Sequence, residues 1–122
     1  MMYACIDFDG TMVDHVYPEI GKPVPGAIEW CKSFMSSGCK IILWTMRSGK
    51  ELAEAVNYMT ENGIELFGVN ENPSQHTWTK SPKAYGHIYI DDAAVGCPLI
   101  SIKGYNRPCV DWEKISNITG IE

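Results

Sequence analysis

The stretch Tyr3-Ala4-Cys5-Ile6-Asp7-Phe8-Asp9-Gly10-Thr11 decides the fold of this chain. Residues 3 to 8 form an apolar run that predicts a buried strand, and Asp9-Gly10 predicts the turn that ends the strand. Asp7 and Asp9 are two positions apart in extended backbone, so their side chains point to the same side. Two acids in this position are candidates for a functional site, although acids and glycine also form ordinary turns.

Helical and extended patterns alternate along the rest of the chain. Helices are predicted from about residue 25 to 38, from 48 to 62 and from 111 to 120, with a short helical turn opening at Ser81-Pro82 and containing Lys83. Further strands are predicted at residues 40–45, 64–69, 87–90 and 99–102. This alternation implies parallel βαβ units. We therefore expect a three-layer α/β/α sandwich with a Rossmann-like, doubly wound parallel sheet of about five strands.

Length and composition predict one ordinary globular domain over residues 1–122. The chain is 45% hydrophobic and 20% charged, which leaves room for a single core and excludes a disordered protein. Residues 11 to 24 hold Pro18, Gly21 and Pro23, and are expected to form an irregular flap. We refer to residues 11–24 as the flap throughout.

Charge and cysteine usage exclude several classes of protein. Ten basic against 15 acidic side chains give a net charge of −5, which disfavours nonspecific nucleic-acid binding. Apolar runs such as residues 41–44 are far too short to span a membrane, and the first residues do not resemble a secretory signal. The five cysteines form no C-x-x-C pair, so reduced, mostly buried thiols and a cytoplasmic location are expected.

The predicted carboxyl ends of the strands carry the candidate site, because ligands bind at that edge of a parallel sheet. Asp7, Asp9, Asp91 and Asp92 are expected to converge there. Two unit charges 4 Å apart repel by roughly 4 kcal/mol at an effective dielectric of about 20, so this arrangement predicts a bound cation. Oxygen ligands without a nearby His or Cys favour Mg²⁺, which binds carboxylates, water and a substrate phosphate.

Three side chains could bind a phosphate beside that metal. The hydroxyl of Thr45 can donate to a phosphoryl oxygen, although a β-branched residue is also common at a strand end. Lys83 in the first turn of a helix would oppose the helix dipole, which an anion at the same place would explain. A solvated lysine is the alternative, with Lys80 as a nearby competitor. Arg47 with the amides of residues 48 and 49 could form an anion site at a helix start, or could simply be exposed.

These residues carry a resemblance to a known family. The string Asp7-Phe8-Asp9-Gly10-Thr11 resembles the first motif, D-x-D-G-T, of the haloacid dehalogenase-like hydrolase superfamily. Thr45, Lys83 and Asp91-Asp92 occur in the order of that family's later motifs. The match extends over nearly the whole chain and is most similar to small members that lack a cap domain.

The resemblance implies a Mg²⁺-dependent phosphomonoester hydrolase. Asp7 would be the nucleophile that forms an aspartyl-phosphate, and Asp9 the general acid and base. The metal would be held by Asp7, the backbone carbonyl of Asp9, and Asp91, with Asp92 direct or through water. The residues implied to contact the substrate phosphate are Thr45, Lys83, Gly10 and Arg47.

A capless protein of this type is expected to have an open site and a small phosphorylated substrate. Selectivity would then come from the flap, from the loop 70–79, or from a neighbouring subunit in a homo-oligomer. His15, His76 and Trp78 are the side chains of these loops that could touch substrate, Trp78 by stacking on a base or sugar. Ala93 and Ala94 follow the acidic pair where many relatives have a larger polar residue, which makes the role of Asp92 less secure than that of Asp91.

Two other functions are compatible with parts of the pattern. A signalling receiver domain shares the length, the acidic pair and a phosphorylated aspartate, but it carries its acidic pair early, whereas here the pair comes late. A phosphate- or nucleotide-binding module that kept the fold without catalysis is the second alternative.

Overall fold

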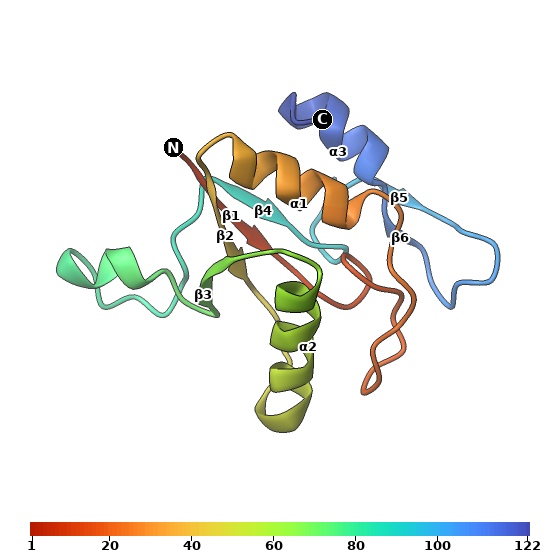
Figure 1. The fold of residues 1–122 in the computed structure, drawn as a ribbon, viewed down its shortest axis with the longest axis horizontal. Helices are drawn as coiled ribbons and strands as arrows, with labels where there is room; N and C mark the ends of the chain where they lie inside the picture. Colours follow the sequence, from red (N-terminus) through yellow and green to blue (C-terminus); the bar gives the residue numbers. More distant parts are fainter.

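A four-stranded parallel sheet forms the centre of the molecule (Figure 1). The structure is a computed structural model and describes residues 1–122. The strands are β1 (Tyr3–Ile6), β2 (Lys40–Leu43), β3 (Leu66–Val69) and β4 (Ile88–Ile90), in the order β3-β2-β1-β4. β1 pairs with β2 on one side and with β4 on the other, so the strand that leads into Asp7 is central. The predicted parallel α/β architecture is therefore confirmed.

All three α-helices pack against the same face of this sheet. They are α1 (Ala27–Ser36), α2 (Gly49–Glu61) and α3 (Trp112–Thr119). Alternate strand residues, such as Ala4 and Ile6 of β1, join the buried side chains of the helices in one core cluster. Within it, Trp30 stacks on Phe34 with ring centroids 4.8 Å apart. The main hydrophobic core thus lies between the helices and one face of the sheet.

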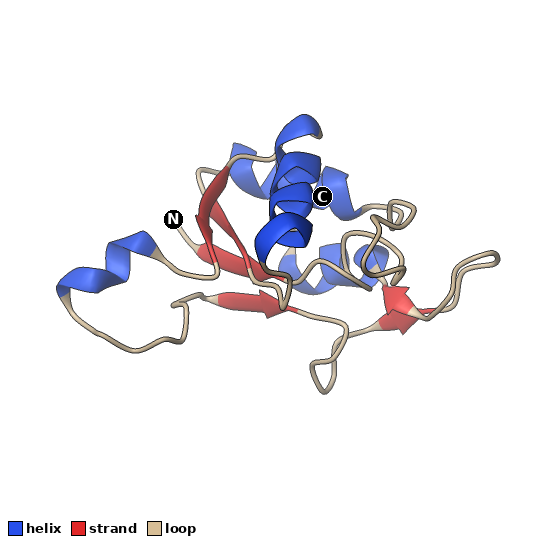
Figure 2. Cartoon of the chain, turned by 90° about the horizontal axis from the view of Figure 1, so that it is seen from below, coloured by secondary structure: helices blue, strands red, loops and turns tan.

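The opposite face of the sheet is only partly covered, by an irregular segment, residues 70–87, whose one short helix is the 3₁₀-helix η1 (Pro73–Thr77). Figure 2 shows this segment extending away from the strands and the three α-helices. Beneath it lies a small cluster of buried residues, Cys5, Ile42 and Ala84. The predicted layer of helices is therefore confirmed on one face, while the three-layer arrangement is not.

Buried amide side chains explain why the segment 70–87 does not need to be helical. Gln75 is buried and donates through Nε2 to the carbonyl of Lys83 at 3.0 Å, while its Oε1 accepts from the amide of Tyr85 at 2.7 Å. Asn72, also buried, donates to the carbonyl of Tyr85 at 3.0 Å. These bonds satisfy backbone groups that a helix would otherwise pair internally.

The helical turn predicted at Ser81-Pro82 is wrong, because residues 81–87 are irregular. The short helix of this region forms earlier, at η1, inside what was expected to be a loop. Asn72 caps it by accepting a hydrogen bond from the amide of Ser74, and Pro73 occupies its first position.

The predicted fifth strand forms but does not join the parallel sheet. β5 (Leu99–Ile100) pairs antiparallel with β6 (Cys109–Val110) in a separate two-stranded sheet. The amide of Val110 donates to the carbonyl of Gly10 at 3.0 Å, which ties this small sheet to the loop after β1. The pairing of β5 with β6 replaces the expected pairing with the main sheet.

The flap is irregular, as predicted, and it is tied down at both ends. The amide of Val24 donates to the carbonyl of Met12 at 2.9 Å, and the amide of Asp14 donates to the carbonyl of Lys22 at 2.8 Å. Met12, Val13 and Val24 are buried in the core. The two ends of the flap are therefore bonded to each other and anchored in the core.

Two further predictions concern the cysteines, expected to be reduced and mostly buried, and the lack of a segment long enough to span a membrane. All five cysteines are free thiols, and Cys5, Cys31 and Cys109 are buried. Burial raises the pKa of the Cys5 thiol to about 11, which keeps it protonated and unreactive. The longest helix, α2, has 13 residues, and none of the helices is long and apolar enough to cross a membrane.

Candidate functional site

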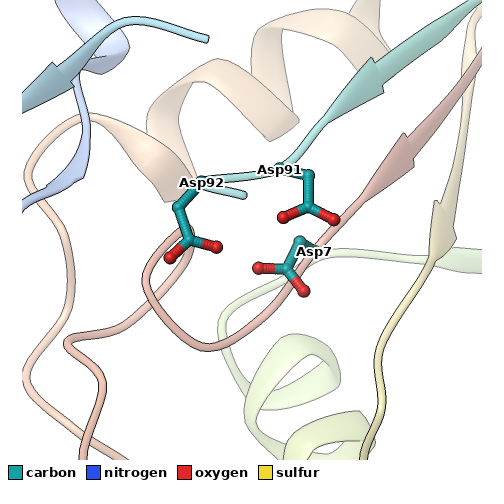
Figure 3. Close-up of side chains that lie close together, drawn as sticks. All are labelled: Asp7, Asp91 and Asp92. Carbon is teal, nitrogen blue, oxygen red and sulfur yellow. The ribbon is translucent and has the colours of Figure 1, made fainter. Parts of the chain in front are cut away.

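Asp7, Asp91 and Asp92 form a compact group that we call the acidic trio. They follow the ends of β1 and β4, which are paired in register at Ile6 and Ile90. Carboxylate oxygens of the three lie within 4.8 Å of one another, and Figure 3 shows the side chains pointing toward a common space. The parallel pairing of two strands distant in sequence thus brings three of the four predicted acids together.

Without a cation, the ionised forms of Asp7 and Asp91 are disfavoured. Burial, a hydrogen bond with Asp92 and the charge of Asp91 raise the pKa of Asp7 from 3.8 to about 8, against a smaller opposing effect from Thr11. Burial is also the main cause that raises the pKa of Asp91. A hard divalent cation would stabilise the ionised carboxylates, so this all-oxygen group fits Mg²⁺.

Thr11 forms hydrogen bonds with two residues of the trio. In the sequence, its position in the D-x-D-G-T string was the only signal for such a role. Its buried hydroxyl donates to Oδ2 of Asp7 at 2.9 Å and accepts from the amide of Asp92 at 3.3 Å. The indole of Trp112 donates to the Thr11 carbonyl at 2.8 Å and holds this turn against α3. Thr11 therefore links the loop after β1 to the loop after β4.

Gly10 makes room for Asp92, and its amide already has a partner within the protein. Its φ of 84° favours glycine, and a Cβ at this position would overlap the carboxylate of Asp92. Its N–H already donates to the carbonyl of Val13 at 2.7 Å. The structure therefore gives Gly10 a steric role beside Asp92, while its phosphate contact stays a prediction.

Asp9 is separated from the trio by its pairing with Arg47. Nε and Nη2 of Arg47 each donate to one carboxylate oxygen of Asp9 at 2.8 Å, a two-pronged ion pair. The guanidinium is 2% exposed, and it lies over the rings of Phe8 and Tyr17.

Arg47 has no donor left for a phosphate. Its remaining N–H groups donate to the carbonyls of Pro18 at 3.0 Å, Glu19 at 2.7 Å and Glu51 at 3.4 Å. The anion site expected from Arg47 at the start of α2 is therefore wrong for this conformation, because burial gives the side chain protein partners instead. Arg47 joins Asp9, the flap and α2.

Thr45 lies two residues beyond the end of β2 and lines both of the cavities that Asp7 lines. Its amide donates to Oδ1 of Asn70 at 2.8 Å, and its hydroxyl oxygen accepts from the amide of Arg47 at 3.1 Å. The hydroxyl hydrogen stays available to donate to a ligand in the adjoining cavity.

Lys83 lies outside the cavity that contains the acids. It is exposed in the irregular segment, and its Nζ lies 5.4 Å from the ring centroid of Tyr89. Tyr89 and Asp91 are two positions apart on β4 and its extension, so Lys83 is on the same face of the sheet as Asp91. The structure does not bring Lys83 into contact with Asp7.

The acids open into a cavity of about 440 Å³ that the flap and the β5–β6 loop help to enclose. Sequence reasoning named His15 from the flap as a residue that could touch substrate, and His15 does line this cavity. It missed Tyr17 of the flap and Arg107 of the β5–β6 loop, because no motif marks either residue. A second cavity of about 270 Å³ reaches Asp7 from the side of Trp44 and Asn70.

The other two loop residues singled out from the sequence do not line either cavity. His76 pairs with Glu71 at 2.9 Å, both of them exposed. Trp78 is 63% exposed and packs edge-on against Tyr85, with ring centroids 5.5 Å apart.

Comparisons with known proteins identify one informative relative. No protein-family model matches the chain, and no curated protein does. A solved structure described as that of a conserved protein from Bacteroides thetaiotaomicron is 32% identical in sequence, with a TM-score of 0.80. The similarity covers 98% of this chain and 89% of the Bacteroides chain, whose description states no activity. At this identity and coverage, the chain belongs to the same family as the conserved protein of Bacteroides thetaiotaomicron.

Proposed function

We propose that this protein is a Mg²⁺-dependent phosphomonoester hydrolase that acts through an aspartyl-phosphate on Asp7. The observation that carries the proposal is the acidic trio, whose oxygens lie within 4.8 Å of one another at the floor of an open cavity. The D-x-D-G-T string supplies one of the three acids and the loop that supports them. The similarity to haloacid dehalogenase-like hydrolases supports the same reaction.

Asp7, Asp91 and Asp92 would hold the metal, with the backbone carbonyl of Asp9 as the further ligand that the family resemblance implies. When bound, Mg²⁺ would offset the negative charges of the nucleophile and of the substrate phosphate. The raised pKa values of Asp7 and Asp91 fit this role, because a bound cation favours their ionised forms.

Asp7 performs the first step as a nucleophile. A carboxylate oxygen of Asp7 forms a bond to phosphorus as the bond from phosphorus to the ester oxygen breaks, which leaves an acyl phosphate. Thr11 restricts the rotation of Asp7 by its hydrogen bond to Oδ2. Thr45 donates its hydroxyl hydrogen to an oxygen of the phosphoryl group.

Asp9 serves as the acid and then the base. It gives a proton to the leaving ester oxygen, then takes one from the water that attacks the acyl phosphate, which releases inorganic phosphate and regenerates Asp7. Both oxygens of Asp9 accept hydrogen bonds from Arg47, so proton transfer requires Asp9 to leave this pairing. Lys83 likewise requires its side chain to leave the ring of Tyr89 before it can contact the phosphate.

A phosphate-binding module without catalysis is the second candidate function. Two observations favour it: Asp9 is occupied by Arg47, and Lys83 does not line the cavity. Such a module would use the same metal and Thr45 but would not turn over its ligand.

The experiment compares phosphate release from p-nitrophenyl phosphate by the wild type, Asp7→Asn and Asp111→Asn, with Mg²⁺ and with a chelator. Asp111→Asn makes the same chemical change at the N-cap of α3, where asparagine also caps well. We expect hydrolysis only with Mg²⁺, with loss of activity in Asp7→Asn and not in Asp111→Asn. Wild-type rates in Asp7→Asn would rule out the nucleophile. Calorimetric binding of phosphate with Mg²⁺, without hydrolysis of any phosphomonoester, would support the binding module.

A further inference from the structure

Of the two arginines that line the main cavity, Arg107 is the one whose guanidinium has no partner within the protein. The cavity is lined by four carboxylates, those of Asp9 and the acidic trio, and by two arginines. Arg47 is buried and its donors are used. The guanidinium of Arg107 makes no hydrogen bond or ion pair within the protein, and the residue is exposed. Arg107 can therefore offer its paired donors to a ligand.

The backbone of Arg107 is held in place by a buried carboxylate. Asp14 is 3% exposed, and its Oδ2 accepts from the amide of Asn106 at 2.8 Å while its Oδ1 accepts from the amide of His15 at 2.8 Å. The carbonyl of Arg107 accepts from Sγ of Cys109 at 3.3 Å. Asp14 thus fastens the β5–β6 loop to the flap and fixes where Arg107 enters the cavity.

Arg107 lines the larger cavity but not the smaller one beside Asp7. Asp7, Thr45 and Asp91, which would contact the reacting phosphate under the proposed function, line both cavities, whereas Arg107 lines only the larger one. The larger cavity, of about 440 Å³, falls in the range of about 300 to 1,000 Å³ that is typical of small-molecule sites. It has room for a substrate that extends beyond its phosphoryl group.

We propose that Arg107 binds a second anionic group of the substrate, and that the substrates are small phosphomonoesters that also carry a carboxylate or another phosphate. This inference rests on the proposed function for the phosphomonoester part. A planar guanidinium recognises both kinds of anion through two parallel hydrogen bonds. Arg107 is thus a specificity-determining residue, contributed by the β5–β6 loop in place of a cap domain.

The test uses two pairs of substrates that differ only in the second anion: phenyl phosphate against 4-carboxyphenyl phosphate, and propanediol monophosphate against propanediol bisphosphate. Arg107→Ala and Arg107→Lys are compared with the wild type. In Arg107→Ala we expect KM to rise about tenfold for the member of at least one pair that carries the second anion, as the loss of a charge-assisted hydrogen bond predicts. KM for the member without it should change less than twofold. Arg107→Lys should lie between, because it keeps the charge and loses the paired donors.

Equal losses of kcat/KM for both members of each pair would overturn the proposal, as would a wild type without preference for either doubly anionic compound. Failure of the proposed function gives a different result, namely no Asp7-dependent hydrolysis of any of the four compounds. In that case calorimetric binding of the same pairs decides the role of Arg107: tighter binding of the doubly anionic members, lost in Arg107→Ala, supports it, and equal binding refutes it.

Discussion

Arg47 and Asp9 are joined by two hydrogen bonds of 2.8 Å, and the same guanidinium donates to the flap carbonyls of Pro18 and Glu19. One buried side chain therefore holds both a proposed catalytic carboxylate and the flap above it. The position of Asp9 and the position of the flap are coupled through Arg47.

Replacing Arg47 should destabilise the fold strongly. Arg47→Ala leaves Asp9 and two flap carbonyls without their partner, and breaking a buried ion pair costs about 3–5 kcal/mol. Arg47→Lys should lose less, because it keeps the charge but not the two-pronged geometry. Urea denaturation measures both free energies of unfolding. Arg107→Ala, an exposed arginine, is the control and should stay within about 0.5 kcal/mol of the wild type. A similar small change in Arg47→Ala would show that the pair contributes little.

Asp7 should make the metal-free protein less stable as the pH rises. Its pKa is about 8 in the folded protein against 3.8 ordinarily, so the native state holds a proton that the unfolded chain has released. Stability therefore falls between about pH 4 and about pH 8. Asp7→Asn removes this dependence, and its stability relative to the wild type should increase over that range. Urea denaturation with a chelator, at several pH values, measures the difference, and Mg²⁺ at about pH 8 should stabilise the wild type far more than the variant. A pH-independent difference between the two proteins would contradict the raised pKa of Asp7.

Gly10→Ala should damage the metal site as well as the backbone. Gly10 and Gly38 share a φ of 84°, but a Cβ at Gly10 would overlap Asp92, whereas a Cβ at Gly38 meets no atom within 4 Å. Both alanine variants should lose about 1–2 kcal/mol of stability from the left-handed backbone. Only Gly10→Ala should also weaken Mg²⁺ binding, measured by calorimetry. Unchanged Mg²⁺ affinity in that variant would mean that Asp92 can move without loss.

Thr11→Val should lower activity, and Thr11→Ser should largely keep it. Valine has the shape of threonine but removes the hydrogen bond to Asp7 and the acceptor for the amide of Asp92. The bond to Thr11 lowers the pKa of Asp7, so its loss raises that pKa further. Leaving the partly buried Asp92 amide without an acceptor costs up to about 1–3 kcal/mol. Steady-state kinetics and urea denaturation check the two effects, and equal losses in the serine variant would assign them to packing instead.

Strands and helices marked by the spacing of apolar residues, and by the residues that begin and end a helix, could be predicted from the sequence. The apolar run before Asp7 does form a central strand, Asp111 caps α3 through the amide of Lys114, and Gly120 ends that helix with a φ of 72°. Each of these depends on a few adjacent residues, which is why local patterns reveal them.

The features that depend on distant partners could not be predicted. Gln75 and Asn72 hold the segment 70–87 without a helix because they meet carbonyls and amides up to 13 positions away. The sequence left two interpretations of Arg47 equally open, an anion ligand or an exposed side chain. In the structure Arg47 instead binds Asp9 and the flap. The acidic trio was predictable because a parallel sheet brings strand ends together whatever lies between them.

The pairing of β1 with β4 also determines when the site is complete. Asp7 follows β1, and Asp91 and Asp92 reach it only after β4 has paired with β1 across a long stretch of intervening chain. Contacts so distant in sequence form slowly during folding. A nascent or truncated chain that ends before β4 therefore has only one carboxylate of the trio, so the proposed cation site would exist only once the sheet is complete.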